Sequence, residues 1–503
     1  MRRKIVLLPL DERPCNAEFP AALFGHGELE IVRPQSLGDK KKRADEKTIE
    51  AYLRRECADA DGLVLSVDML LYGGLVPSRI HHDTLEQLQR AADVIRDLKK
   101  ENPALLVFAF QVIMRCPDYS SDDEEPEYYE ICGEAIHRTG EIVHKGRLGL
   151  NGDGGMNGIL PEIDPDYLND YVGRRELNRE MNAYMLRFLE EGSIDFMVIP
   201  QDDAARYGYA AMDQEAVRSR IIEKNLSDRI LIYPGADEVG LTLIGRMINK
   251  LSGKKPKVYI KYLCEQAKTI IPLYEGNTLS GTIKYHLLAA GCCTTESYEQ
   301  ADMILVVTAP AGQMKEAVVQ PCPLPEYRTE RNYPEMLDFI TDRMAEGKIV
   351  TIADNAYANG GDLELIRLLD HAGLLLAVDG YAGWNTSANT LGTAIAEGID
   401  AYYSGRSSSH TAFLLQRYLE DAGYCSVVRQ QVTQELEAEG EGLGYFDVRE
   451  ERGEAAHRVA RGLAAFAGDY LSSIADDIII EDVHMPWRRM FEVGFRARLR
   501  DAQ

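Results

Sequence analysis

Two adjacent carboxylates, Asp202 and Asp203, follow a short apolar run at residues 196–199, and their types and spacing could do acid–base chemistry. Neighbouring carboxylates repel each other when both are charged, so one should resist ionisation and act as a general acid while the other stays charged. A simpler interpretation is that Asp203 caps the next helix and Asp202 is merely exposed. The position of the pair at the end of the fourth predicted strand supports the catalytic interpretation.

Other polar side chains follow other apolar runs. Asp11 and Arg13 follow the first run beside prolines that stiffen the loop, an arrangement that suits the binding of hydroxyls or a carboxylate, although a local salt bridge would look identical. Asp237 could line the site, whereas the next residue, Glu238, is better explained as a helix cap. The remaining candidates for substrate binding are Asp68, Tyr72, Arg79, Arg115, Asp354, Asn359, Trp384 and Asn385.

Trp384 is one of only two tryptophans and lies among amides and hydroxyls, where its ring could form the floor of a sugar site or anchor the core. The chain has no Walker A loop, no dinucleotide glycine fingerprint, no His-Glu-x-x-His and no Gly-x-Ser-x-Gly, so we expect no cofactor. We also expect no metal, with a magnesium or calcium site built from Asp202, Asp203 and Asp237 as the alternative.

The elements that must position these residues are nine short apolar runs, most of them followed by a helical pattern, which is typical of parallel strands buried on both faces. The runs lie at residues 5–8, 62–66, 105–110, 196–199, 230–233, 258–262, 303–307, 349–352 and 374–378. We predict an α/β fold, a (β/α)8 TIM-like barrel over residues 1–400 with inserted loops, one of them at residues 117–158. Two open sheets, divided near residues 250–256, are the alternative.

Residues 401–503 are predicted to form a helical C-terminal extension, which could act as a cap or as a homo-oligomer contact. The formal net charge of −25 disfavours nucleic acid and anionic membranes as partners. Nine cysteines without paired spacing favour a reducing compartment, and no apolar run approaches the roughly 20 residues of a membrane span. We therefore expect a cytoplasmic protein.

Five strings in order, Pro9-Leu-Asp-Glu-Arg-Pro14, Tyr72-Gly-Gly-Leu75, Gln201-Asp-Asp203, Gly235-Ala-Asp-Glu238 and Gly383-Trp-Asn-Thr386, resemble a bacterial family known as domain of unknown function 4127. The resemblance covers almost the whole chain. The Asp202-Asp203 pair is also similar to the acid pair of barrel glycosidases that cleave 2-acetamido sugars with substrate assistance. That second resemblance rests on the pair and its setting alone.

The glycosidase resemblance implies an exo-acting, retaining β-N-acetylhexosaminidase in which Asp202 polarises the acetamido group and Asp203 is the general acid and base. The substrate would then be a carbohydrate carrying GlcNAc or GalNAc, with Trp384 as the floor of the site. Those enzymes usually carry several tryptophans, and this chain has two. A metal-dependent hydrolase using the same carboxylates, or a non-catalytic protein that binds cell-wall sugars, are the alternatives.

Overall fold

The computed structural model describes residues 2–150, 163–440 and 442–500. The chain divides into two compact units. Unit 1 comprises Met1–Glu12, Glu28–Gly240 and Tyr274–Asn277, and unit 2 comprises Arg13–Gly27, Leu241–Leu273 and Thr278–Gln503. Each unit contains its own parallel sheet.

The sheet of unit 1 has six parallel strands in the order β2-β1-β3-β4-β5-β6. The strands are β1 (Arg3–Leu8), β2 (Leu29–Val32), β3 (Gly62–Ser66), β4 (Leu106–Phe110), β5 (Phe196–Gln201) and β6 (Ile230–Pro234). Because all of them are parallel, their carboxyl ends lie along one edge of the sheet. The chain runs from β1 to β2 on one side and then to β3 on the other, which makes the ends of β1 and β3 the topological switch point where α/β sheets bind ligands.

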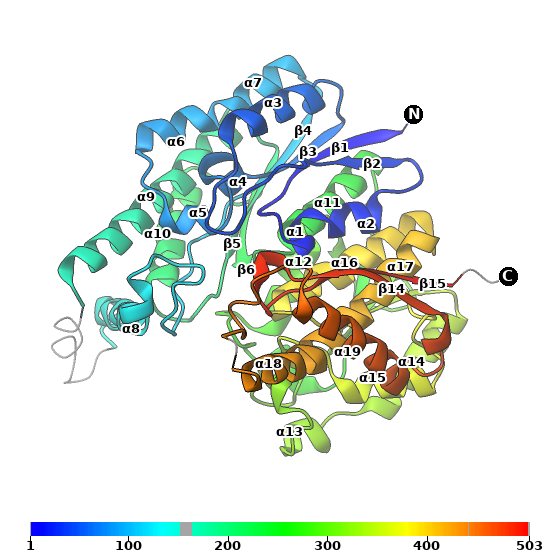
Figure 1. Ribbon diagram of the computed structural model, residues 1–503. Coiled ribbons are helices and arrows are strands. Elements are labelled where there is room, and N and C mark those ends of the chain that lie inside the picture. The colour runs from blue at the N-terminus through cyan, green and yellow to red at the C-terminus, as the bar shows by residue number, and fades with distance from the viewer. Residues whose placement is uncertain (1, 151–162, 441, 501–503) are drawn as a thin grey trace. The chain divides into compact units, whose positions relative to one another are not determined.

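Helices cover one face of this sheet and share a core with it, as Figure 1 shows. Their inward side chains are mainly leucine, isoleucine and methionine at helical spacing, and they pack on alternate side chains of the strands, such as Leu63 and Leu65 of β3. The covering helices are α3 (Glu46–Cys57), α6 (Leu85–Ala92), α7 (Val94–Glu101), α9 (Pro165–Glu190) and α10 (Tyr209–Glu223). Two shorter helices, α4 (Val67–Tyr72) and α5 (Pro77–Ile80), follow β3 directly.

The sheet of unit 2 has five parallel strands in the order β13-β11-β9-β7-β8. They are β7 (Lys257–Tyr262), β8 (Cys293–Thr294), β9 (Met303–Thr308), β11 (Ile349–Asp354) and β13 (Gly380–Ala382). A short parallel pair, β10 (Lys315–Glu316) and β12 (Tyr357–Ala358), lies beyond it. Helix α16 (Ser387–Ser404) is buried from Ser387 to Ala401, which explains its many alanine, glycine and threonine residues.

The remaining elements of unit 2 share a core with this sheet. These are α14 (Tyr333–Ala345), α15 (Leu363–His371), α17 (Ser408–Arg417), the π-helical segment η4 (Tyr418–Val428), α18 (Arg429–Ala438), α19 (Glu454–Tyr470) and the antiparallel strands β14 (Ile478–His484) and β15 (Gly494–Leu499). The other helices of this region are the short helices α1 (Pro14–Ala17), α2 (Phe19–Phe24) and α13 (Pro325–Arg328), and the longer helices α11 (Val239–Ser252) and α12 (Leu279–Ala289).

The predicted α/β class with parallel strands is confirmed, and the sheets are open rather than closed on themselves. The two larger sheets are thus both open, which is the arrangement considered as the alternative to a barrel. The main division lies at Gly240 rather than at residues 250–256. Eight of the nine predicted runs contain strands. The ninth was wrong, because residues 374–378 form turns after α15 and the strand is β13.

Two regional predictions need correction. The segment at residues 117–158, predicted as a loop, contains the helix α8 (Tyr129–Arg147), and its last part, from residue 151, lies outside the described residues. Residues 401–503 are helical in part, but they also contain β14 and β15 and pack into the core of unit 2. Among the described helices, none is both long and hydrophobic enough to serve as a membrane span.

Candidate functional site

Charged side chains gather at the carboxyl edge of the unit 1 sheet. Asp202 and Asp203 follow β5, Arg115 follows β4, and Arg79 lies on α5 after β3. Glu124 and Glu125, from the segment before α8, complete a group of six residues that we call the acid–arginine cluster.

Arg79 is the centre of the acid–arginine cluster, with a side chain that is only 1% exposed. Its Nη2 donates to Oδ2 of Asp202 at 2.5 Å, and its Nη1 donates to Oε2 of Glu124 at 2.8 Å. The same nitrogen lies 3.4 Å from Oε1 of Glu125. A buried guanidinium with several carboxylate partners has little freedom to rotate, so it fixes the orientation of Asp202.

Arg115 makes the second set of contacts. Its Nε donates to Oε1 of Glu125 at 2.8 Å, and its Nη1 donates to Oδ2 of Asp203 at 3.0 Å. Its Nη2 lies 3.3 Å from Oε2 of Glu124. The two glutamates therefore connect the two arginines, and each arginine holds one member of the Asp202-Asp203 pair.

Asp203 has an unusual backbone conformation and a raised pKa. Its φ of 41° is in the left-handed region, which an aspartate can adopt at a cost of about 1 kcal/mol and which is common at functional sites. Burial, followed by the negative charge of Asp202, raises the pKa of Asp203 to about 7. Asp203 can therefore carry a proton near neutral pH, which is the property required of a general acid.

Asp68 is a second carboxyl group near this cluster. It lies in the first turn of α4, is 2% exposed, and its Oδ2 accepts a hydrogen bond of 2.8 Å from the backbone N–H of Val112. Burial raises the pKa of Asp68 to about 7, and the charges of Arg79 and Asp202 also act on it. The structure thus brings together five of the predicted site residues at one sheet edge: Asp68, Arg79, Arg115, Asp202 and Asp203.

Three other predicted residues of unit 1 are buried, and two of them follow strands. Asp11 follows β1 and is 1% exposed, and Asp237 follows β6 and is 6% exposed. Tyr72 packs its ring 4.5 Å from the ring of His81, which indicates a packing role. Glu238, predicted as a helix cap, accepts a hydrogen bond of 3.0 Å from the backbone N–H of Ala236 and so braces the loop after β6.

In unit 2, four predicted residues line one small cavity: Arg13, Asn359, Trp384 and Asn385. Its volume of about 20 Å³ is room for one water molecule and is too small for a sugar ring. The indole N–H of Trp384 donates to Oγ1 of Thr393 at 3.1 Å, and the ring packs edge-on against Phe19. Trp384 therefore anchors the core, the alternative to its predicted role as the floor of a sugar site.

The other predicted residues of unit 2 are held by internal contacts. Asn359 donates from its backbone N–H to the carbonyl of Asn385 at 2.8 Å, which joins the loops after β12 and β13. Asp354 is fully buried, accepts from Thr308 at 2.6 Å and from Tyr381 at 2.9 Å, and has a pKa that burial raises to about 6. It ties β9, β11 and β13 together rather than facing a ligand.

Arg13 forms a salt bridge, which was the alternative to ligand binding, but its partner is distant in the sequence and not local. Its Nη1 lies 3.2 Å from Oε1 of Glu492, and its guanidinium lies 4.6 Å from the ring of Trp487. Arg489 contacts the same ring at 4.6 Å and donates from Nε to Oε2 of Glu492 at 2.8 Å. Trp487, Arg489 and Glu492 were not predicted, and the only signal for them was the run of basic residues after Trp487.

The next question is whether side chains that could bind a metal ion lie close together. Across residues 2–150, 163–440 and 442–500, no group of three or more histidine, cysteine, aspartate or glutamate side chains is placed to hold an ion. The carboxylates of the acid–arginine cluster are instead directed at guanidinium groups.

Comparison with known proteins gives a family but no activity. No curated protein is significantly similar to this chain. The sequence model of the family described as "Protein of unknown function (DUF4127)" matches residues 5–496, nearly the whole chain, and the protein therefore belongs to this family.

Proposed function

We propose that this protein is a glycoside hydrolase whose general acid is Asp203. The observation that supports the proposal is the carboxyl pair at the end of β5, in which Asp203 has a pKa of about 7 and Asp202 is held by Arg79. A carboxylic acid that keeps its proton near neutral pH can protonate the oxygen of a leaving group. The proposal requires only the carboxyl edge of the unit 1 sheet, and it gives no role to Trp384.

Within this class, we favour an exo-acting, retaining β-N-acetylhexosaminidase. Asp203 would donate its proton to the glycosidic oxygen as the bond from that oxygen to the anomeric carbon breaks. The carbonyl oxygen of the sugar's own acetamido group, polarised by Asp202 through the N–H, would attack the anomeric carbon from the opposite face. Water would then open the cyclic intermediate and return a proton to Asp203, and two inversions retain the configuration.

The adjacency of the two acids supports substrate assistance over a direct carboxylate nucleophile. Consecutive side chains after a strand cannot easily lie on opposite faces of one sugar ring, as a retaining acid and nucleophile must. Asp202 is also occupied at Oδ2 by Arg79, at 2.5 Å, which suits an orienting role better than attack on carbon.

The test is a panel of 4-nitrophenyl glycosides that includes GlcNAc, GalNAc, glucose and galactose in both anomers. Hydrolysis confined to the β-acetamido sugars is expected, with loss in Asp203→Asn and Asp202→Asn. The matched control is Asp228→Asn, because Asp228 is exposed and precedes β6, at the opposite edge of the same sheet. A thermal shift with sugars but no turnover would instead identify a binding protein, and equal turnover of glucosides would exclude substrate assistance.

A further inference from the structure

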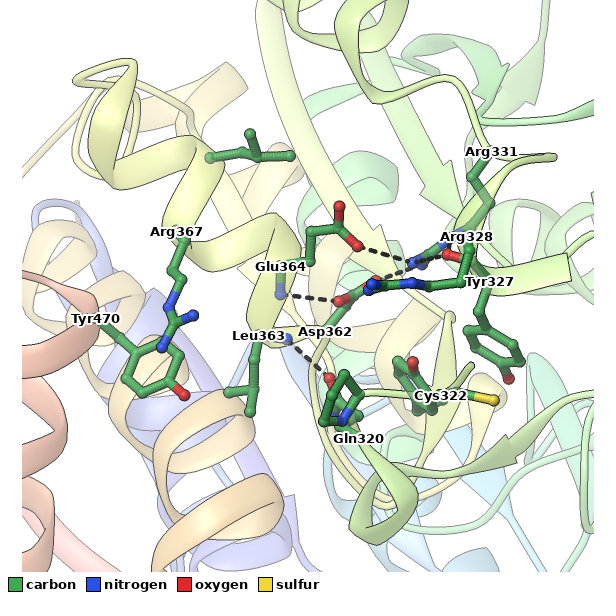
Figure 2. Close-up of a pocket in the computed structure, with 13 residues that line it drawn as sticks. Gln320, Cys322, Tyr327, Arg328, Arg331, Asp362, Leu363, Glu364, Arg367 and Tyr470 are labelled. Atoms are coloured by element: carbon green, nitrogen blue, oxygen red, sulfur yellow. Dashed lines mark hydrogen bonds and ion pairs between the residues drawn. The ribbon is translucent and has the colours of Figure 1, made fainter. Parts of the chain in front are cut away.

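A second cavity, in unit 2, is larger than the Trp384 cavity and was not predicted. Its volume is about 360 Å³, within the range of small-molecule sites, and Figure 2 shows the residues that line it. We call it the arginine–tyrosine pocket after its main members, which are Arg328, Arg331, Arg367, Tyr327, Tyr357 and Tyr470.

Arg331 forms the rigid wall of the pocket. Its side chain is 2% exposed, and its Nε and Nη2 donate to the carbonyl of Tyr327 at 2.9 and 2.7 Å. Its Nη1 donates to the hydroxyl of Tyr333 at 2.8 Å and to the carboxylate of Asp362. All of its nitrogens are thus engaged within the protein, so Arg331 shapes the pocket rather than offering donors to a ligand.

The acids of the pocket are engaged as well. Asp362 accepts from Arg331, from the hydroxyl of Tyr333, and from the backbone N–H of Glu364 at 3.0 Å. Glu364 lies 3.4 Å from Arg331. Both carboxylates therefore pair with Arg331, and neither is paired with the other two arginines.

Arg328 and Arg367 are left with unpaired charges. In the part of the chain that the structure describes, neither forms an ion pair, and Arg367 rests on the ring of Tyr470 at 4.4 Å. Figure 2 shows Arg328 extending from the end of α13 toward the amino end of α15, while Arg367 leaves α15 next to Tyr470. Two exposed guanidinium groups without an ion pair thus line one cavity.

We propose that the arginine–tyrosine pocket binds a small organic oxyanion with a flat body, such as an aryl phosphate or an aryl carboxylate. Arg328 and Arg367 hold the oxyanion, because a guanidinium matches the geometry of phosphate and carboxylate oxygens. The faces of the tyrosine rings are already covered, since Tyr327 stacks on Tyr357 at 4.6 Å and Tyr470 stacks on Phe466 at 4.7 Å. The flat body therefore lies against the apolar side chains that line the pocket, which are Pro321, Leu363 and Leu368. This site is independent of the acid–arginine cluster and of the proposed hydrolase activity.

Titration calorimetry on the full chain tests the proposal, with phenyl phosphate, benzoate, inorganic phosphate and phenol as probes. Phenyl phosphate or benzoate is expected to bind at one site, more tightly than inorganic phosphate, and phenol is expected not to bind. Each of Arg328→Gln and Arg367→Gln should weaken binding roughly tenfold or more, because each removes charged hydrogen bonds to the ligand. Both residues are at the surface, so the variants should fold.

The matched control is Arg461→Gln, since Arg461 is an exposed arginine of α19 in the same unit, with 69% side-chain exposure, and does not line the pocket. It should bind phenyl phosphate as the wild type does. Leu363→Ala, which shortens an apolar side chain of the lining, should weaken phenyl phosphate while leaving inorganic phosphate unchanged. Three outcomes would overturn the proposal: no saturable binding of either aryl oxyanion, binding that survives both arginine variants, or equal affinity for phenyl phosphate and inorganic phosphate.

Discussion

Arg79 donates a hydrogen bond of 2.5 Å from Nη2 to Oδ2 of Asp202, within a cluster where Arg115 holds the neighbouring Asp203 at 3.0 Å. Two adjacent carboxyl groups thus have separate guanidinium partners, but only Asp203 has a left-handed backbone. Burial raises the pKa of Asp203 to about 7. This asymmetry divides the two chemical roles in the proposed mechanism.

The first prediction concerns the leaving group. Asp203→Asn removes the proton donor but keeps the side-chain volume, so hydrolysis of a substrate with a poor leaving group, such as an alkyl glycoside, should fall about 10²-fold to 10⁴-fold. A 4-nitrophenyl glycoside needs little protonation and should lose much less. Steady-state kcat/KM for the two substrates measures the difference. Equal losses on both would argue against an acid role for Asp203.

The second prediction concerns pH. A general acid works in its protonated form, so kcat/KM should be constant below neutrality and should fall as the pH rises through about 7, the pKa of Asp203. The positive charge of Arg115 lowers that pKa, so Arg115→Gln should move the falling limb to higher pH. Arg138→Gln, on the exposed surface of α8, is the control and should leave the limb in place.

Asp68 could produce the same limb, because burial raises its pKa to about 7 as well. A pH–rate profile of Asp68→Asn separates the two carboxyl groups. If Asp203 is the acid, the limb should persist in this variant, at slightly lower pH because one negative charge has been removed from the neighbourhood. Loss of the limb in Asp68→Asn would assign the acid role to Asp68 instead.

The sequence predicted the strands better than their grouping. Apolar runs such as residues 62–66 identify buried strands whatever sheet they join, so the α/β class followed from them, while the choice between one closed sheet and two open ones did not. The run at residues 374–378 failed because Leu374, Leu375 and Val378 are buried in turns, and burial alone does not distinguish a strand from a packed turn.

The acid–arginine cluster could be predicted in part, because some of its residues directly follow strands. Asp202, Asp203 and Arg115 were found for that reason, because parallel strands bring their carboxyl ends to one edge. Glu124 and Glu125 were missed, since they reach the cluster from a long segment before α8. The partner of Arg13, Glu492, lies 479 residues away, and no local pattern can indicate such a contact.

The third prediction concerns the stability of unit 1. Arg79→Met leaves Asp202, Glu124 and Glu125 without one of their cations in a buried setting, and breaking such a network costs about 3–5 kcal/mol. Both tryptophans belong to unit 2, so fluorescence would miss this loss. The loss of stability should instead appear as faster hydrogen exchange of the β5 amides. The control is Arg90→Met, because the ion pair of Arg90 with Glu86 is largely exposed. It should change the free energy of exchange of the same amides by less than about 1 kcal/mol.

The fourth prediction concerns Trp384 and separates anchoring from ligand binding. Trp384→Ala removes a buried indole and should cost about 3–5 kcal/mol, while Trp384→Phe loses mainly the hydrogen bond to Thr393, about 1 kcal/mol. The fluorescence of Trp487, in the same unit, reports unfolding in both variants.

Thr393→Val completes a double-mutant cycle for that hydrogen bond. Because Trp384 and Thr393 share one bond of 3.1 Å, the double variant Trp384→Phe with Thr393→Val should cost less than the sum of the two single changes. A floor for a sugar ring would behave differently, since Trp384→Phe would then weaken sugar binding without a loss of stability, and the two changes would be additive. Denaturant unfolding of the four proteins, monitored through Trp487, decides between the two roles, and additive costs would contradict the anchoring role derived from the structure.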